Sequence, residues 1–161
     1  MLQLTNKNYQ NSDNMKLSTR GRYGTRAVLE LALRYGEGPV LLKDVASRQD
    51  IPVSYLENLM GALRAAGLVA TVRGMHGGYY LAKPPSEIRL SQIVAALEGS
   101  IAPVECVDDH KHCSRAELCV TRDVWSEVKQ AIEGVLESIT VEELVRRHRE
   151  KQSPTPSRYY I

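Results

Sequence analysis

Two short helical patterns, followed at once by a glycine-containing hairpin pattern, most constrain how this chain can fold. Residues 41–49 and 53–66 repeat apolar side chains at helical spacing, and Asp50-Ile51-Pro52 separates them as a tight turn. Ser54 and Glu57 fit a capping box for the second helix, which Gly67 ends as a left-handed residue. The side chains expected to be buried are Leu42, Val45 and Ala46 in the first helix and Leu56, Leu59, Met60 and Leu63 in the second. Two short helices joined by such a turn are typical of a helix-turn-helix.

The residues after this pair predict a wing. Residues 68–72 and 79–82 are β-prone and enclose the sequence Arg73-Gly-Met-His-Gly-Gly78. Glycines let a backbone approach a phosphate or a groove floor closely, and Arg73 suits a narrow minor groove. An ordinary flexible hairpin is the alternative, but its position directly after the helix pair favours contact with DNA.

The second helix is expected to read the major groove of double-stranded DNA. Asn can read adenine, and Glu can accept from the N4 amino group of cytosine. Between Lys16 and Arg89 there are eleven Lys and Arg against six Asp and Glu, a basic balance that points weakly to nucleic acid. The residues expected to contact DNA are Ser54, Tyr55, Glu57, Asn58 and Arg64 on the helix and Arg73, His76, Gly77 and Gly78 in the wing.

The other helical patterns complete a mainly α fold with a small β-wing. Residues 17–35 form a first helix capped by Ser18 or Thr19, and residues 90–98 form another, which Gly99 ends. The longest pattern is 123–139, and Thr140 begins a last helix to about residue 151. Because a long helix at the end of a small chain has little domain left to cover it, we expect a homodimer through this helix; docking onto its own domain is the alternative.

All three cysteines of the chain, Cys106, Cys113 and Cys119, lie within one polar segment. An odd number of cysteines is a poor basis for a disulfide framework, whereas clustered cysteines in a reducing compartment more often bind metal or act in redox chemistry. The segment has little to bury, so bound metal would supply the order that burial cannot.

Three thiolates leave one ligand short of the four that zinc prefers and that iron–sulfur clusters usually take. Three unligated thiols on a mobile loop are the simplest alternative. The neighbouring side chains able to complete the set are His110, His112, Asp108, Asp109, Glu117 and Asp123, with His112 the first choice.

The chain shows no signal peptide and no stretch of about 18 apolar residues that could span a membrane, so a cytoplasmic protein without membrane association is expected. No nucleophile with a neighbouring base and no substrate-binding glycine motif indicates an enzyme. The expected organisation is a disordered extension (1–14), a winged helix-turn-helix domain (15–85), a short helix with the cysteine loop (86–121), the dimerisation and C-terminal helices (122–151) and a flexible tail (152–161).

Several stretches together resemble the winged-helix transcription regulators of the IscR/NsrR/CymR type, and among them the iron–sulfur cluster regulators. The matching stretches are MKLSTRGRYGTRA (15–27), IPVSYLENLMGALRAAGLV (51–69), VRGMHGGYYLAK (72–83), the three cysteines and ITVEELV (139–145). The resemblance implies a homodimer on near-palindromic promoter DNA. It also implies an iron–sulfur cluster at the cysteines, 2Fe–2S favoured over 4Fe–4S, that senses iron, redox state or nitric oxide and changes which DNA is bound.

The resemblance also implies roles for single residues. Glu57 matches a recognition-helix glutamate that links DNA selectivity to cluster occupancy, and Arg73 matches a wing arginine that enters the minor groove. Two positions depart from the family pattern. Arg122 stands where the cluster regulators have a ligating histidine, and Arg22 stands where the nitric-oxide-sensing members have a ligating aspartate. The fourth ligand and the cluster type therefore stay open.

Three rival functions remain. The first is a winged-helix regulator without a cluster, whose cysteines are thiol redox switches or a zinc site. The second is an electron carrier or enzyme built on a metal cluster, in which the winged-helix pattern would have no purpose. The third is a regulatory partner that acts through protein contact.

Overall fold

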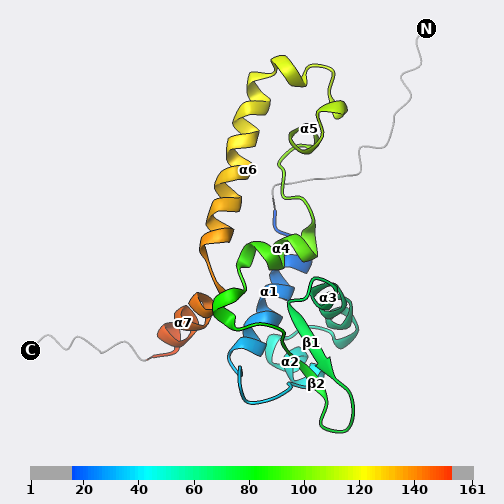
Figure 1. Cartoon of the computed structure of the whole chain (residues 1–161), viewed down its shortest axis with the longest axis vertical. Coiled ribbons are helices and arrows are strands. Elements are labelled where there is room, and N and C mark those ends of the chain that lie inside the picture. Colours follow the sequence, from blue (N-terminus) through cyan, green and yellow to red (C-terminus); the bar gives the residue numbers. More distant parts are fainter. Residues whose placement is uncertain (1–15, 154–161) are drawn as a thin grey trace, which may run out of the picture.

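A computed structural model describes residues 16–153 of the 161-residue chain. The predicted extension at 1–14 and nearly all of the predicted tail at 152–161 lie outside the described residues. The first half is a winged helix-turn-helix, as the sequence predicted (Figure 1). Its elements are α1 (Thr19–Ala32), α2 (Leu42–Gln49), α3 (Val53–Ala65), β1 (Val69–Val72) and β2 (Gly78–Leu81). The strands pair antiparallel, with Val69 opposite Leu81 and Val72 opposite Gly78.

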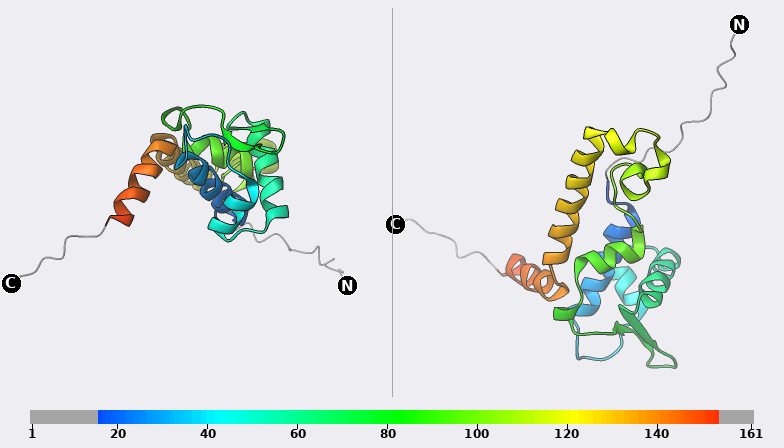
Figure 2. Two further views of the ribbon diagram at one scale, coloured as in Figure 1. Left: turned by 90° about the horizontal axis from the view of Figure 1, so that it is seen from below. Right: turned by 45° about the horizontal axis from the view of Figure 1, so that its top comes forward.

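The second half adds two helices that pack on this unit, α4 and α7, and between them a loop and a long helix that project from it. Helix α6 extends away from it, and the cysteine loop lies beside the far end of α6 (Figures 1 and 2). The elements are η1 (Pro85–Glu87), α4 (Leu90–Glu98), α5 (Glu105–Asp108), η2 (His110–His112), η3 (Ala116–Leu118), α6 (Val120–Ser138) and α7 (Val141–Gln152). Among the residues that the structure describes, no helix combines the length and apolar character needed to cross a membrane.

The hydrophobic core joins the winged-helix elements to α4 and α7. The predicted stripe of α3 is fully buried, and the predicted inward residues of α2 are buried or partly buried. Ile93, Val94 and Leu97 of α4 are buried as well. Val141 and Val145 of α7 belong to the same core. Burial of a Leu, Ile, Val or Met side chain contributes about 1.5–3 kcal/mol, so this cluster is the main stabilising feature of the fold. The central core residues are Val28, Val45, Leu56, Leu59, Met60, Leu63, Leu68, Ile88, Ile93 and Val141.

Close packing joins α1 to α4. A Cβ at Gly24 would lie 2.1 Å from Leu97 Cδ1, so a larger residue there would force the buried Leu97 side chain to shift. Glu98, in the last turn of α4, reaches the N-terminus of α1. Its Oε1 accepts from Ser18 Oγ at 2.6 Å and from the Gly21 amide at 2.8 Å. A carboxylate is favoured there because the free N–H groups of a helix N-terminus carry partial positive charge.

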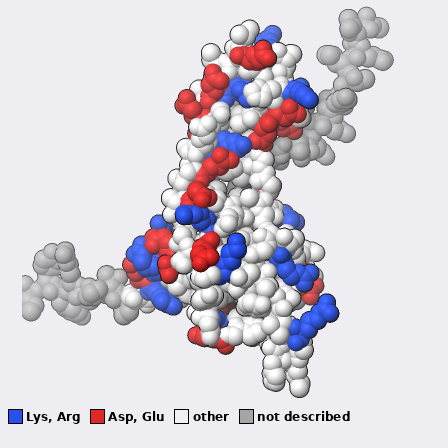
Figure 3. Space-filling view, viewed as in Figure 1, with Lys and Arg blue, Asp and Glu red and all other residues white. Residues whose placement is uncertain are grey.

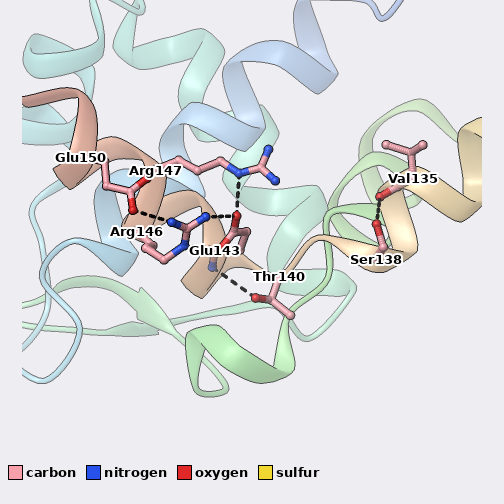
Figure 4. A network of polar contacts seen from close by, with 7 residues as sticks. All are labelled: Val135, Ser138, Thr140, Glu143, Arg146, Arg147 and Glu150. Atoms are coloured by element: carbon pink, nitrogen blue, oxygen red, sulfur yellow. Dashed lines mark hydrogen bonds and ion pairs between the residues drawn. The ribbon is translucent and has the colours of Figure 1, made fainter.

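Helix α7 begins with a side-chain cap and carries ion pairs in its first turns (Figure 4). Thr140 Oγ1 accepts from the Glu143 amide at 3.2 Å, so the predicted cap is present. The Glu143 carboxylate accepts from Arg146 and Arg147 instead of closing a capping box. Hydrogen bonds from Arg146 and then Arg147 lower the pKa of Glu143 from 4.5 to about 2.

Two local predictions were wrong. Helix α3 begins after Pro52 with no side-chain cap, so Ser54 and Glu57 do not form a capping box. Helix α6 begins at Val120, three residues before the predicted start, because the turn after Cys119 continues directly into the helix.

Candidate nucleic-acid interface and candidate metal centre

The turn between α2 and α3 gives the helix pair its fixed geometry. Asp50 adopts a left-handed conformation with φ of 52°, which Asp tolerates better than most residues. Pro52 then occupies the N-cap position of α3, directly before its first turn. After α3, Gly67 is also left-handed, with φ of 71°, as predicted. The two turns hold α3 against α1 and α2 by its buried stripe, so its opposite side faces outward.

The outward side of α3 carries most of the predicted DNA contacts. Ser54, Glu57, Asn58 and Arg64 are exposed, although the Asn58 side-chain amide also donates to the Ser54 carbonyl of its own helix at 3.2 Å. Tyr55 was expected to be exposed and is not, because its ring packs edge-on against Tyr23 at 6.0 Å between centroids. Tyr55 therefore helps to fix α3 on α1.

The wing is pinned to the rest of the unit at its base. The Val40 amide and carbonyl each bond to Tyr79 at 2.8 Å, which adds a short bridge beside β2. A Cβ at Gly78 would lie 2.5 Å from the Val40 carbonyl oxygen, and one at Gly77 would lie 2.2 Å from the Val72 carbonyl oxygen. Both glycines thus serve the internal packing of the wing. Gly77 is buried, so the expectation that it offers its backbone to DNA does not match its position.

Positive charge borders the wing. Arg73 and His76 are both exposed in the connection between β1 and β2. Figure 3 shows Lys and Arg side chains on the part of the molecule beside the wing, whereas Asp and Glu mix with them along α6 and the cysteine loop. A recognition helix and a neighbouring wing with local positive charge can contact two adjacent grooves of a duplex.

The cysteine loop consists of short turns with little buried surface. Its thiols are free and half-buried, and Ala116 is its buried apolar residue. Within residues 16–153, no three side chains of His, Cys, Asp or Glu converge in a metal-binding arrangement. Cys119 Sγ lies 3.1 Å from Thr121 Oγ1, and this hydrogen bond, with a second from the Arg122 amide, lowers the pKa of the Cys119 thiol.

Arg122 occupies the position where a fourth ligand was expected and bridges the loop instead. Its Nε donates to the Cys106 carbonyl at 2.8 Å, and its terminal nitrogen lies 3.0 Å from His110 Nε2. His112, the first choice for a fourth ligand, faces carboxylates. Its Nδ1 lies 3.4 Å from Asp109, and its Nε2 lies 3.7 Å from Glu105. The structure therefore leaves the predicted ligand role of His112 untested.

An ion pair attaches the first turn of the loop to α6. Lys129 Nζ lies 2.8 Å from Asp108 Oδ1, and Ser100 also donates to Asp108. The hydrogen bond from Lys129, followed by that from Ser100, lowers the pKa of Asp108, and the same bond raises the pKa of Lys129. The pair borders a cavity of about 530 Å³ between α4 and α6.

Sequence reasoning missed three side chains that make contacts between distant parts of the chain. Glu98, Lys129 and Arg122 each act on a partner at least sixteen residues away. Helical spacing identified Glu98 only as a residue of the last turn before Gly99. A carboxylate beside the start of α1 could have been inferred only with the packing of α4 on α1 in hand.

The comparisons with known proteins agree with this fold. The family model Rrf2, described as iron-dependent transcriptional regulator, matches residues 17–147. The chain is 45% identical over 132 residues to the protein rrf2 of Nitratidesulfovibrio vulgaris, which covers 82% of this chain and 88% of that protein.

Two solved structures share the fold. The structure of T. potens IscR has a TM-score of 0.74 at 41% identity and covers 90% of this chain and 96% of its own. CymR, the global cysteine regulator of B. subtilis, has a TM-score of 0.69 at 41% identity and covers 82% and 97%. The predicted resemblance is confirmed, and the chain belongs to the Rrf2 family of transcriptional regulators.

Proposed function

We propose that the chain is a homodimeric regulator that binds promoter DNA and senses iron, redox state or nitric oxide through an iron–sulfur cluster. The observation that carries the proposal is the position of Cys106, Cys113 and Cys119. All three free thiols lie in one loop between α4, which is hydrogen-bonded to α1, and the exposed helix α6. A ligand in this loop would act between the DNA-binding unit and the dimer contact.

DNA recognition is assigned to α3 and the wing. The exposed side of α3 would lie in the major groove, with Asn58 suited to adenine and Glu57 suited to cytosine. Arg73 would lie in the minor groove. Ser54, Arg64 and His76 are exposed around them and complete the proposed contacts. The DNA-binding function itself is that of the family.

Dimerisation is assigned to α6. None of its side chains, all within the described part of the chain, is buried, although it carries an apolar stripe. Val124 is 52% exposed and Val135 is 59% exposed. An exposed apolar stripe of this kind marks a protein contact, and a two-fold pair of identical helices covers both stripes at once. Two-fold symmetry would then place the two recognition helices about one helical turn of DNA apart.

The cluster is assigned to the three thiols because their chemistry fits it. Thiolates are the ligands that iron–sulfur clusters require, and the loop has no core that a change of shape would break. The thiols are not preassembled, so the loop would rearrange to bring them together. Such a cluster would supply the response to iron, oxidants or nitric oxide. The fourth donor is proposed to be His112, with Asp108, Asp109, Glu117, Asp123, a small thiol or the partner chain as alternatives.

The link from the loop to DNA would run through Glu98. Its carboxylate accepts hydrogen bonds from Ser18 and Gly21 at the start of α1. Glu98 is also the last residue of α4, so it lies directly before the segment that leads to the cysteines. Helix α1 in turn packs on α3, partly through the ring contact of Tyr23 and Tyr55. A change in the loop that moves Glu98 would therefore change the support of the recognition helix.

A gel-shift comparison tests this function. The duplex would be selected from a random-sequence pool by the anaerobically reconstituted protein, and the salt concentration would be fixed. Cluster-loaded and cluster-free protein should differ in affinity by about 5- to 150-fold, the usual range of coupling between two ligands. Cys113→Ala should behave as cluster-free protein under both conditions. Equal affinities for loaded and cluster-free protein would contradict a sensing role.

A second candidate is a regulator whose thiols respond without a cluster. The favouring observation is Cys119, whose lowered pKa increases the reactive thiolate near neutral pH. The similarity to CymR, the global cysteine regulator, supports the same idea. A zinc site is the other cluster-free form. Zinc analysis of the purified protein, with peroxide treatment of wild type and Cys119→Ser before a gel shift, separates these alternatives from the cluster.

A further inference from the structure

Met75 is the most exposed apolar side chain of the winged-helix unit. It is 91% exposed, whereas Val69 and Leu81 of the same hairpin are 2% and 4% exposed. Its side chain therefore contributes almost nothing to the folded core.

The turn that carries Met75 is built to present it. The Gly77 amide donates to the Gly74 carbonyl at 3.0 Å, which makes Met75 and His76 the two central residues of a four-residue turn. Gly74 has φ of 111°, a conformation that disfavours any residue with a Cβ. Because Gly74, Gly77 and Gly78 have no side chains, Met75 and His76 project from a thin tip. The bridge between Val40 and Tyr79 fixes the base of this hairpin.

The uncharged tip around Met75 suits contact with the apolar face of a DNA base. The residues from Gly74 to Gly78 include no Lys, Arg, Asp or Glu, and the end of the wing is uncharged in Figure 3. Arg73 stands directly before this tip and can contact phosphates or the groove. The minor groove is about 6 Å wide, which favours a thin hairpin tip with few side chains.

We propose that Met75 is a wedge that inserts between two base pairs from the minor groove and unstacks that step. The proposal deepens the DNA recognition proposed above and rests on it. Apolar side chains, Met among them, serve this purpose in minor-groove proteins, where they kink the duplex by about 20–90°. Pyrimidine–purine steps unstack most easily, so the wedge selects TA or CA/TG steps under the wing without hydrogen bonds to their bases.

Fluorescence of 2-aminopurine in the duplex tests the wedge, because unstacking increases it. The duplex is one selected from a random pool by the wild-type protein, and the probe is placed at the step under the wing. Wild type should raise the fluorescence and bend the DNA. Met75→Ala should lose both effects and about tenfold in affinity, the equivalent of about 1.4 kcal/mol. The slope of affinity against salt should stay unchanged, because phosphate contacts set it. Met75→Leu, which keeps an apolar wedge, should retain the fluorescence and the bend.

Leu118→Ala is the matched control, because Leu118 is 92% exposed and lies far from the wing in the cysteine loop. It should leave the fluorescence and the bend as in wild type. If Met75→Ala unstacks and bends DNA like wild type, the wedge is wrong while DNA binding stands. A loss of affinity with unchanged fluorescence would reduce Met75 to a simple groove contact and also refutes the wedge. A wild-type protein that selects no duplex overturns the DNA-binding function along with it.

Discussion

The winged-helix unit and the segment from Ser100 to Ser138 differ in how their apolar side chains are covered. In the first, residues from α1 to β2 form one core with α4 and α7, and many of its side chains are fully buried. In the second, Ala116 is the buried apolar residue in the described loop, and α6 leaves Val124 and Val135 more than half exposed.

This difference indicates what each region needs in order to be ordered. The first region obtains its stability from its own core. The second has charged contacts such as Asp108 with Lys129, but exposed ion pairs contribute little to stability, typically 0–1 kcal/mol. In our proposal it therefore depends on a second copy of the chain along α6 and on a cluster in the loop.

The largest expected effect comes from a cavity in the core. Leu59→Ala should lower the free energy of unfolding by about 2–5 kcal/mol, because a fully buried side chain is lost and the cavity collapses only in part. Leu118→Ala, in the exposed loop, should change it by less than about 0.5 kcal/mol. Urea unfolding followed by circular dichroism measures both. If both variants lost a similar free energy of unfolding, the winged-helix unit and the loop would not differ in how much their apolar side chains contribute to stability.

Close packing of α1 on α4 predicts the next effect. Gly24→Ala places a methyl group within 2.1 Å of Leu97 and should cost about 1–3 kcal/mol. Gly61→Ala, in α3 with open space around it, should instead stabilise by about 0.5–1 kcal/mol, because alanine favours a helix more than glycine does. Thermal unfolding of the two variants should move in opposite directions. A stabilised Gly24→Ala protein would mean that α4 packs on α1 less closely than described.

A charge on the apolar stripe of α6 tests its need for a partner. Val135→Asp should weaken self-association at least about tenfold, because a carboxylate would be buried without a partner. Gln130→Asp, on the opposite side of the same helix, should leave association unchanged. Sedimentation equilibrium reports the dissociation constants. A Val135→Asp protein that dimerises like wild type would place the interface elsewhere.

The smallest expected effect is a pH dependence of α7. Because the pKa of Glu143 falls from 4.5 to about 2 on folding, its stabilisation is present above pH 4.5 and is lost as the pH falls towards 2. The difference in the midpoint of unfolding between wild type and Glu143→Gln should therefore become smaller as the pH is lowered from 4.5 to 2. Glu142→Gln, its exposed neighbour, serves as the control. A difference that persists undiminished at pH 2 would contradict the ion pairs with Arg146 and Arg147.

Local sequence patterns predicted the fold well where one helix or turn decides it. The bounds of α4, the buried stripe of α3 and the left-handed Gly67 were all correct. Patterns failed where distant residues decide. Tyr55 is half-buried because Tyr23 of another helix meets its ring.

The candidate site was predictable in composition and not in arrangement. Spacing alone grouped the three cysteines and predicted that α3 and the wing contact DNA. It could not show that Arg122 bonds to the Cys106 carbonyl or that Lys129 holds Asp108, because these contacts depend on the path of the loop along α6. The choice of a fourth ligand for the proposed cluster depends on the same path.

Anaerobic reconstitution with iron and sulfide tests the central claim most directly. The dimer should bind iron and acid-labile sulfide and gain visible absorption, and Cys113→Ala should lose all three while it remains a dimer. A wild-type protein that stays colourless and free of iron after reconstitution would contradict the cluster and leave the thiol or zinc function in its place.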